Sequence, residues 1–413
     1  MFDLKFLREH PEVVKKNNLR RGCAVDLDTL LELNTQQRAL QLSIETHRAK
    51  RKTTSKTKPS PEEITAMRKL GEEIEHDEQI VHELELQIQE LFSQLPNILA
   101  DDVPDGKDDS DNVVVKTVGE KPIFSFPPLD HMTLGEQLDL IDTKHASEVS
   151  GSRFYYLKNE AAFLRLALHR WGWEKLKAEG FTLMTTPHLA RPETLYGTGY
   201  LPFFKDDVWK LEGSDLALIG TSEQTLVAYH QNEMLSESDL PKRYSAVSEC
   251  FRTEAGAYGK DTKGIFRVHE FWKMEQIILC TPEQVEELHQ KALAVEEWFA
   301  NELGIPYQIV LVCTGDCGAP GYKKYDLEAW FPSQARYREL TSNTNLTDFQ
   351  SRRLNIRYKD ASGQIHYPYT ISATALTDRW IIAIMELNQQ PDGSIRVPTV
   401  LQPYMGIDVI GKK

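Results

Sequence analysis

Two short motifs stand on either side of a glycine-containing loop: Phe251-Arg252-Thr253-Glu254 and Arg267-Val268-His269-Glu270-Phe271. The loop, from Ala255 to Gly264, supplies the glycines and polar groups that a long hairpin needs. Because side chains alternate between the two faces of a strand, a two-stranded hairpin places the charged groups and a phenyl ring on one surface. The residues predicted to share that surface are Arg252, Glu254, Arg267, His269, Phe271, Lys273 and Glu275.

This surface suits a nucleoside triphosphate. Arginines meet phosphates through charge-assisted hydrogen bonds, a ring offers a base a stacking face, and a carboxylate accepts from an exocyclic amine. The alternative is a salt-bridged sheet face, which a lone Arg-x-Glu would favour. The ordered set of Arg-x-Glu, glycine loop and Arg-x-x-x-Phe favours the nucleotide interpretation.

Length and composition are typical of a globular protein of the cytoplasm. With 413 residues, 40% of them hydrophobic and 27% charged, the chain can bury a sizeable core and is expected to hold two domains. No apolar run is long enough to span a bilayer, and the charged segment from Met1 to Glu9 lacks the core of a signal peptide. An odd number of cysteines, five, fits a reducing compartment. Cys313 and Cys317 have no second ligand pair nearby, so no structural zinc site is expected.

The first hundred residues carry two heptad-patterned helices. In the second, apolar residues recur at alternating steps of three and four, with Asp77 filling one position: Ile74, Val81, Leu84, Ile88, Leu91 and Leu95. The first shows matching spacing, interrupted by Gln37, at Leu30, Leu33, Leu40 and Ile44. Proline and acids at Pro59-Ser60-Pro61-Glu62-Glu63 mark the start of the second helix. Two such helices joined by a short polar turn predict an antiparallel coiled-coil arm of roughly 45 Å.

The turn of this arm is basic, on a chain whose formal net charge is −14. Its cations, with no acid among them, are Arg48, Lys50, Arg51, Lys52, Lys56 and Lys58. An exposed cationic tip attracts phosphates and releases counterions on binding. The alternative is an ordinary solvated tip, and the segment by itself does not decide between the two.

An acidic, turn-forming segment follows the arm. After Leu95-Pro96-Asn97, the run from Asp101 to Asp109 predicts a linker. The remainder mixes helical patterns at 161–180 and 380–387 with strand-like runs at 181–187, 217–219, 244–254, 266–280, 308–312 and 367–371. Hairpins flanked by helices predict an α+β fold with a largely antiparallel sheet. We therefore expect a helical domain at 1–100, an acidic linker at 101–112 and a catalytic domain at 113–413.

Taken together, the motifs resemble the class II aminoacyl-tRNA synthetases and, in detail, the seryl-tRNA synthetase family. They are Gly220-Thr221-Ser222-Glu223, Phe251-Arg252-Thr253-Glu254-Ala255-Gly256, Tyr337-Arg338-Glu339-Leu340-Thr341-Ser342-Asn343, Phe349-Gln350-Ser351-Arg352-Arg353-Leu354-Asn355-Ile356-Arg357 and Val397-Pro398. The opening Phe2–Arg8 segment and the arm also resemble that family, so the similarity covers essentially the whole chain. Ordered agreement of this kind is far more specific than one short motif. It implies a seven-stranded type of antiparallel sheet flanked by helices, preceded by the coiled-coil arm.

The resemblance also implies a function. The chain would attach L-serine to tRNA(Ser) at the expense of ATP, through a seryl-adenylate, and whether tRNA(Sec) is also charged is left open. A homodimer would form through the 161–187 unit. The arm of one subunit would hold the variable arm of a tRNA whose acceptor end enters the site of the other. Structured RNA is read largely by backbone and shape, which suits the six cations of the tip as the tRNA-binding residues.

The implied ATP-binding residues are Arg252, Thr253, Glu254, Arg267, Val268, Phe271, Glu339, Leu340, Thr341, Ser342 and Arg379. Two of them are the implied catalytic residues: Arg252 would hold the α-phosphate with the serine carboxylate, and Arg379 would lie across the adenine opposite Phe271. Arg267 would reach the far phosphates, and Glu254 would accept from the adenine amine. Glu339 and Ser342 would bind Mg²⁺, because carboxylate and hydroxyl oxygens suit that hard cation.

The implied serine-binding residues are Thr221, Ser222, Glu223, Glu275, Ser372 and Thr374. Thr374 matches the residue that meets the serine hydroxyl, and such a contact discriminates against analogues lacking it by roughly 10⁴-fold or more. The chain departs from the family pattern here. Asn-Gly usually precedes that residue and glycines follow it, whereas this chain has Ser372-Ala373-Thr374-Ala375. Losing glycine restricts close backbone approach to a ligand, so the departure bears on the serine pocket, and Leu346 also replaces a common cysteine.

Two other functions fit parts of the chain. A ligase that loads a small amino acid onto a carrier protein would share the catalytic motifs but lack the arm at 27–95. A catalytically inactive, synthetase-like regulatory protein would not need the intact set of Arg252, Glu254, Arg267, Phe271, Glu339 and Arg379. Both features favour an active synthetase.

Overall fold

The structure is a computed structural model that describes residues 2–54, 60–255 and 264–412. The described chain divides into two compact units, one from Phe2 to Ile98 and the other from Leu99 onward. Among the described residues, no helix combines the length and the hydropathy needed to cross a membrane.

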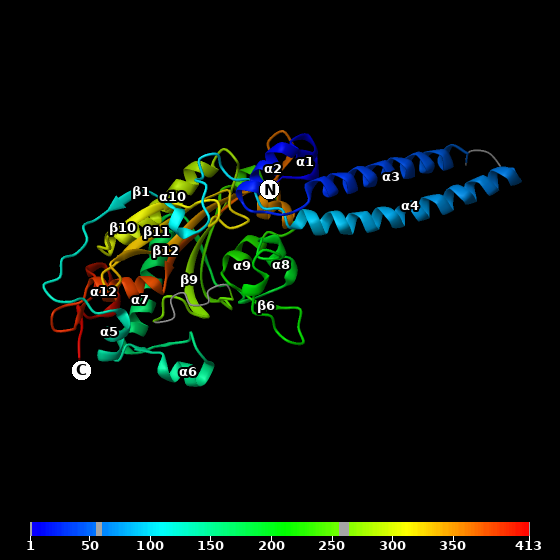
Figure 1. Cartoon of the computed structure of the whole chain (residues 1–413). Helices are drawn as coiled ribbons and strands as arrows, with labels where there is room; N and C mark the ends of the chain where they lie inside the picture. The colour runs from blue at the N-terminus through cyan, green and yellow to red at the C-terminus, as the bar shows by residue number, and fades with distance from the viewer. Residues whose placement is uncertain (1, 55–59, 256–263, 413) are drawn as a thin grey trace. The chain divides into compact units, whose positions relative to one another are not determined.

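The first unit consists of four helices in the described residues: α1 (Leu4–Glu9), α2 (Pro11–Arg20), α3 (Leu27–Thr54) and α4 (Pro61–Ser93). The long pair, α3 and α4, runs antiparallel (Figure 1). Ser60 caps α4 in a reciprocal pair of hydrogen bonds with Glu63, as the sequence signal predicts. Ile44, Ile74 and Val81 are buried between the helices. The predicted two-helix arm is therefore present, although α4 ends before Leu95.

The second unit is built on an eight-stranded sheet in the part of the chain that the structure describes. Its order is β1 (Val113–Val118), β10 (Tyr307–Leu311), β11 (Lys323–Phe331), β12 (Arg336–Thr347), β15 (Tyr369–Thr377), β9 (Glu270–Cys280), β8 (Lys242–Phe251) and β4 (Thr182–Met184). The first seven strands in that order are antiparallel to their neighbours, and β4 adds to β8 in parallel. The largely antiparallel α+β fold predicted from the sequence is confirmed, with one more strand than the resemblance implies.

The two faces of this sheet have different coverings. On β9, Met274 and Ile278 belong to the main core, which α7 (Asn159–Ala178), α10 (Val285–Glu302) and α12 (Arg379–Leu387) help to form. The alternate residues Ile277 and Leu279 pack with Leu226 of α9 (Glu223–Ala228) on the opposite face. Phe271, Lys273 and Glu275 share the face of Ile277, because side chains alternate along a strand. The part of this face near the start of β9, where these three residues lie, remains open to a ligand.

The remaining elements are short. The helices are α5 (His131–Gln137), α6 (Lys144–Ser150), α8 (Pro192–Gly197), α11 (Phe349–Arg353) and α13 (Gln402–Met405). The small sheets pair β2 (Ile141–Asp142) with β3 (Tyr156–Leu157), β5 (Leu189–Ala190) with β6 (Ala217–Leu218), and β16 (Ile395–Arg396) with β17 (Val409–Ile410). A further sheet joins β7 (Met234–Ser236), β13 (Arg357–Lys359) and β14 (Ile365–His366).

Candidate active site

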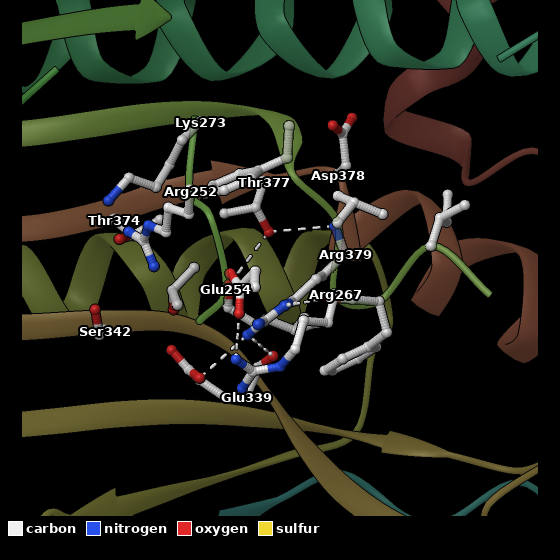
Figure 2. Close-up of a pocket in the computed structure, with 16 residues that line it drawn as sticks. Arg252, Glu254, Arg267, Lys273, Glu339, Ser342, Thr374, Thr377, Asp378 and Arg379 are labelled. Carbon is white, nitrogen blue, oxygen red and sulfur yellow. Dashed lines mark hydrogen bonds and ion pairs between the residues drawn. The ribbon is translucent and has the colours of Figure 1, made fainter. Parts of the chain in front are cut away.

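A cavity of about 170 Å³ opens beside the ends of β8, β9 and β15, the middle of β12 and the first residue of α12. Ten of the eleven predicted ATP-binding residues line it: Arg252, Glu254, Arg267, Val268, Phe271, Glu339, Leu340, Thr341, Ser342 and Arg379. In Figure 2, Arg252, Lys273 and Thr374 lie at one end, and Glu254, Arg267, Arg379 and Glu339 cluster toward the other. The eleventh, Thr253, bonds instead to the backbone of Asp206 and Asp207.

The paired strands of the hairpin are shorter than the sequence analysis predicts. β8 ends at Phe251 and β9 begins at Glu270, so Arg252, Glu254 and Arg267 lie beyond the paired strands. The prediction that strand alternation orients them is therefore wrong. The Arg252 amide still donates to the His269 carbonyl at 2.9 Å, which continues the pairing by one bond. Glu254 then adopts a left-handed conformation (φ 55°), which is uncommon for a residue with a side chain and turns the chain across the cavity.

Two ion pairs bridge the cavity. Arg267 Nη1 lies 2.5 Å from Glu254 Oε2, and Arg379 Nη1 lies 3.1 Å from Glu339 Oε2 (Figure 2). Glu339 is only partly buried; this burial opposes its ionisation, but the Arg379 guanidinium and Lys324 outweigh it and lower the pKa of that carboxyl to about 2. Glu339 is therefore an anion at neutral pH. The Arg267 Nε–H is buried without a partner among the described residues, so this guanidinium keeps a donor for a ligand.

Each of two arginines faces an aromatic ring. The Arg252 guanidinium carbon lies 5.2 Å from the centre of the Phe271 ring, and that of Arg379 lies 4.5 Å from the Phe266 ring. Both distances are within cation–π range. Phe266 also lines the cavity and had no role in the sequence prediction. The predicted opposition of Arg379 and Phe271 across a base is a statement about a complex with nucleotide, and it stays a prediction.

Several predicted serine-binding residues meet beneath Lys273. Thr221 Oγ1 donates to Glu275 Oε1 at 2.5 Å, and both side chains are fully buried. The Lys273 ammonium contacts the same Glu275 oxygen. Thr374 is paired with Glu275 across β15 and β9, and it lines the cavity. The pocket therefore holds an acid whose natural partner is an ammonium group.

Glu223 and Ser372 complete this region. Glu223 begins α9 and accepts from Gln350 Nε2 at 2.6 Å. Burial, followed by the nearby Glu275, raises the pKa of Glu223 above its usual value. Ser372 lies two residues before Thr374 on β15. The hydroxyl of Ser222, another predicted serine-binding residue, is buried without a partner among the described residues.

Besides Phe266, the sequence analysis gave no role to Lys273 or Asp378, which also line the cavity. Lys273 was placed on the correct face but received no role, although its ammonium contacts Glu275, one of the predicted serine-binding residues. Asp378 lines the cavity wall immediately before Arg379, and its carboxylate points toward α7 (Figure 2). No sequence signal identifies its partner, Arg165, because 213 positions separate the two residues.

The predicted tRNA-binding residues lie in the other unit. Arg48, Lys50, Arg51 and Lys52 belong to the last turns of α3 and not to a turn between helices. All four are exposed, and Arg48 Nη2 pairs with Glu78 at 2.6 Å. The predicted residues Lys56 and Lys58 fall outside the described residues.

Two family models match the chain. Residues 1–99 match the seryl-tRNA synthetase N-terminal domain, and residues 207–388 match the tRNA synthetase class II core domain (G, H, P, S and T). A serine--tRNA ligase of Treponema denticola is 44% identical over 422 aligned residues, covering 100% of both chains. The chain belongs to the seryl-tRNA synthetase family.

Solved structures of this family agree in fold. The seryl-tRNA synthetase from Pyrococcus horikoshii, in a complex with ATP, matches with a TM-score of 0.96 and 39% identity over 100% of both chains. The cytoplasmic serine-tRNA ligase from Naegleria fowleri, in a complex with AMP, matches with a TM-score of 0.90 and 32% identity over 100% of this chain and 99% of that one. In this family member the cavity is lined by three arginines, two phenyl rings and the ionised Glu339, and Thr374 connects it to the buried Glu275.

Proposed function

We propose that this protein attaches L-serine to tRNA(Ser) through a seryl-adenylate intermediate. One observation carries the proposal: the arginines and Phe271 that suit ATP line a cavity that continues to Thr374, next to the Glu275 pocket. Membership of the seryl-tRNA synthetase family supports the same reaction. All five cysteines are free, which fits the reducing cytoplasm where we place the reaction.

In the first step a serine carboxylate oxygen attacks the α-phosphorus of ATP and pyrophosphate leaves. Positioning and charge stabilisation are what this kind of transfer requires of a protein. Arg252 lines the cavity at the end where Lys273 and Thr374 lie (Figure 2), so its guanidinium can hold the carboxylate and the α-phosphate together. The Arg267 guanidinium, which pairs with Glu254 in the free protein, can bind the outer phosphates of ATP instead. Its Nε–H, which has no partner among the described residues, supplies a further donor. The nucleophile is already ionised, and no general base is needed.

The serine ammonium binds Glu275 in this proposal. The contact between Lys273 and Glu275 supports it, because an ammonium already occupies that carboxylate in the free protein. Thr221 orients Glu275, Glu223 adds a second negative charge, and the Thr374 hydroxyl meets that of serine. Ser372 stands where the family usually has asparagine, so the selectivity for serine depends chiefly on Thr374.

Glu339 and Ser342 fit Mg²⁺ as ligands. Both line the cavity, Glu339 is ionised, and its side chain is 42% exposed, so a carboxylate and a hydroxyl oxygen are available to a hard cation. When bound there, Mg²⁺ would neutralise negative charge on the phosphate oxygens. The residues of the chain position the substrates around it.

The transfer step needs tRNA. We propose that residues 1–100 bind its variable arm, with Arg48, Lys50, Arg51, Lys52, Lys56 and Lys58 on its phosphates. Residues 101–112 link this domain to the catalytic residues 113–413. Phe163 and Leu166 of α7 are 63% and 59% exposed, and this apolar face supports a homodimer that binds tRNA across its subunits. Charging of tRNA(Sec) is a further proposal that shares the same acceptor chemistry.

The test is serine-dependent exchange of pyrophosphate into ATP, followed by serylation of tRNA(Ser) and tRNA(Sec) transcripts. We expect exchange with serine and acylation of tRNA(Ser). Exchange with another small amino acid, and loading of a carrier protein, would favour the ligase alternative. Absence of exchange with any amino acid would favour the inactive regulatory protein.

A further inference from the structure

A histidine and a glutamate outside the cavity form a buried pair. His131 is the first residue of α5, and Glu386 lies near the end of α12. Glu386 Oε1 accepts from the backbone amide of His131 at 3.1 Å and from its ring Nδ1 at 2.9 Å. The other carboxylate oxygen accepts from Ser333 Oγ, in the turn between β11 and β12, at 2.6 Å. Neither member of the pair lines the cavity or was assigned a role in binding ATP or serine.

The second ring nitrogen of His131 contacts the chain shortly before Arg267. The Ile265 amide donates to His131 Nε2 at 3.4 Å. A ring nitrogen that accepts a hydrogen bond carries no proton, so the proton of the neutral ring is on Nδ1, which donates to Glu386. Glu386 therefore selects the tautomer of His131 that can receive the Ile265 amide.

The residue before Ile265 fits closely against the same ring. Gly264 has a positive φ of 83°, a conformation that glycine adopts without strain. A methyl group on Gly264 would overlap His131 Nε2. The bonds to Glu386 hold the ring on its other side, so the chain and not the ring would have to shift. Glycine at this position thus permits the close approach of the Ile265 amide to His131.

The segment held in this way, residues 264–267, forms one wall of the ATP cavity. Ile265, Phe266 and Arg267 all line it. The Phe266 carbonyl accepts from Arg379 Nε at 3.3 Å, and the Arg379 guanidinium lies over the Phe266 ring. Arg379 and Glu386 belong to the same helix, α12. This helix therefore holds the segment at two points, directly at Phe266 and through His131 at Ile265.

We propose that His131 is a positioning residue for ATP, kept in the required tautomer by Glu386; the inference rests on the proposed function. The bond to Ile265 holds Phe266 and Arg267 in the cavity before ATP arrives, so binding does not have to order them. The contacts of Glu275 with Thr221 and Lys273, in the serine pocket, do not involve this segment. Loss of the bond should weaken ATP binding and leave serine binding unchanged.

The experiment uses two substitutions that separate the roles of the two ring nitrogens. In His131→Asn the amide nitrogen replaces Nδ1 and can still donate to Glu386, but no acceptor reaches Ile265. In His131→Gln the amide oxygen replaces Nε2 and can accept from the Ile265 amide. Calorimetric titration of the full chain with ATP and Mg²⁺ should show a Kd raised about fivefold in His131→Asn and within about twofold of wild type in His131→Gln. The KM for serine in pyrophosphate exchange should stay within about twofold of wild type in both.

His230 provides a matched control. It is also buried, its Nδ1 lies 2.7 Å from Glu233 Oε2, and its Nε2 lies 2.8 Å from the Tyr244 hydroxyl. It does not line the ATP cavity. In urea denaturation, His230→Asn should lose a free energy of unfolding comparable with that lost in His131→Asn, whereas its Kd for ATP should stay within about twofold of wild type. The control separates a loss of stability from a loss of position.

Gly264→Ala tests the same contact from the side of the chain, at a residue that is only partly buried. It should raise the Kd for ATP about fivefold, and combining it with His131→Asn should add nothing, because both changes break one bond. An unchanged Kd in His131→Asn, an equal rise in His131→Gln, or additive effects in the double variant would overturn the proposal. Absence of serine-dependent exchange in wild type would instead overturn the proposed function, and the ATP titrations would still decide the role of His131.

Discussion

Arg165 of α7 and Asp378, the residue before α12, form a buried ion pair with two parallel hydrogen bonds. Arg165 Nε lies 2.8 Å from Asp378 Oδ1, and Nη2 lies 3.0 Å from Oδ2. The Tyr155 hydroxyl and the Trp272 amide also donate to Oδ2, at 2.6 and 2.9 Å. Asp378 therefore joins α7 and β9 to the start of the helix that carries Arg379. The position of Arg379 in the cavity depends on this network.

Removing one partner of this pair should damage stability and catalysis together. Arg165→Met leaves the Asp378 carboxylate, which is 5% exposed, without its cation, and such a change costs about 3–5 kcal/mol. Asp378→Asn should lower the rate of pyrophosphate exchange about tenfold through a lower kcat, with the KM for serine little changed. Urea denaturation and exchange kinetics measure the two effects. The control is Arg170→Met on the same helix, because the Arg170 side chain is 72% exposed and water screens its pair with Glu174, so little stability should be lost.

The hydroxyl of Thr374 should determine the preference for serine over alanine. Thr374→Val has the same shape but no hydroxyl, so we expect the ratio of kcat/KM for serine to that for alanine to fall at least about tenfold. Thr377→Val on the same strand is a matched control, because Thr377 Oγ1 bonds to the Leu340 carbonyl and the Arg379 amide at the nucleotide end. A serine preference that survives in Thr374→Val would assign the recognition of the hydroxyl elsewhere.

The site could be predicted from the sequence where its residues fall within short motifs. Arg252, Glu254, Arg267 and Phe271 are close in the chain and line one cavity. Phe271 lies on a face of β9, whereas the three charged residues lie beyond the strand ends. Arg379 was named because the family resemblance implies it, and the structure places it at the start of an apolar helix. Local motifs, together with the family resemblance, were sufficient for these residues.

The sequence did not predict the centre of the sheet. β11 and β12 were both missed. On β11 the alternation of Leu327, Ala329 and Phe331 into the core was overlooked. On β12 the buried face is largely polar: Thr341, Asn343 and Asn345 are almost fully buried but break the apolar alternation by which a strand is recognised. Hydrogen bonds to α10 satisfy some of them, such as that from Asn343 Nδ2 to the His289 carbonyl at 2.9 Å. Contacts between distant segments, including Arg165 with Asp378, leave no local signal.

Serine binding should weaken in acid as Glu223 takes up a proton. Burial and the nearby Glu275 raise the pKa of Glu223 above its usual value in the free protein, and only the carboxylate attracts the serine ammonium. We therefore expect kcat/KM for serine to rise with pH through an ionisation that lies above about 4.5. Glu223→Gln should lower kcat/KM and remove this limb of the pH profile. If the acidic limb of the profile stayed at the same pH in Glu223→Gln, the ionisation would belong to another group.

The cations at the end of α3 should act on tRNA alone. Reversing charge at Arg51 and Lys52 should raise the KM for tRNA about tenfold and leave pyrophosphate exchange unchanged. The slope of log KM against log salt should fall by about 2, if each residue contacts one phosphate. Lys5→Glu with Lys16→Glu makes the same change in net charge at exposed positions of α1 and α2, and it should have little effect. Equal loss of exchange and charging would contradict the role of the arm.

Glu296 of α10 should make the fold less stable as pH rises. It is fully buried and accepts from Thr341 Oγ1 at 2.7 Å. Burial raises the pKa of Glu296 well above its usual value. The negative charge of Asp326 raises this pKa further, and the hydrogen bond from Thr341 lowers it by less than burial raises it. The folded protein therefore holds a proton that the unfolded chain releases above about pH 4.5, so stability falls as pH rises through this window. Glutamine accepts the same hydrogen bond without a charge, so Glu296→Gln should be stabilising by about 1–3 kcal/mol near about pH 8, with a smaller gain near about pH 5.5. Urea denaturation at the two pH values measures this difference, and a loss of stability that is the same at both would show that Glu296 is not protonated in the fold.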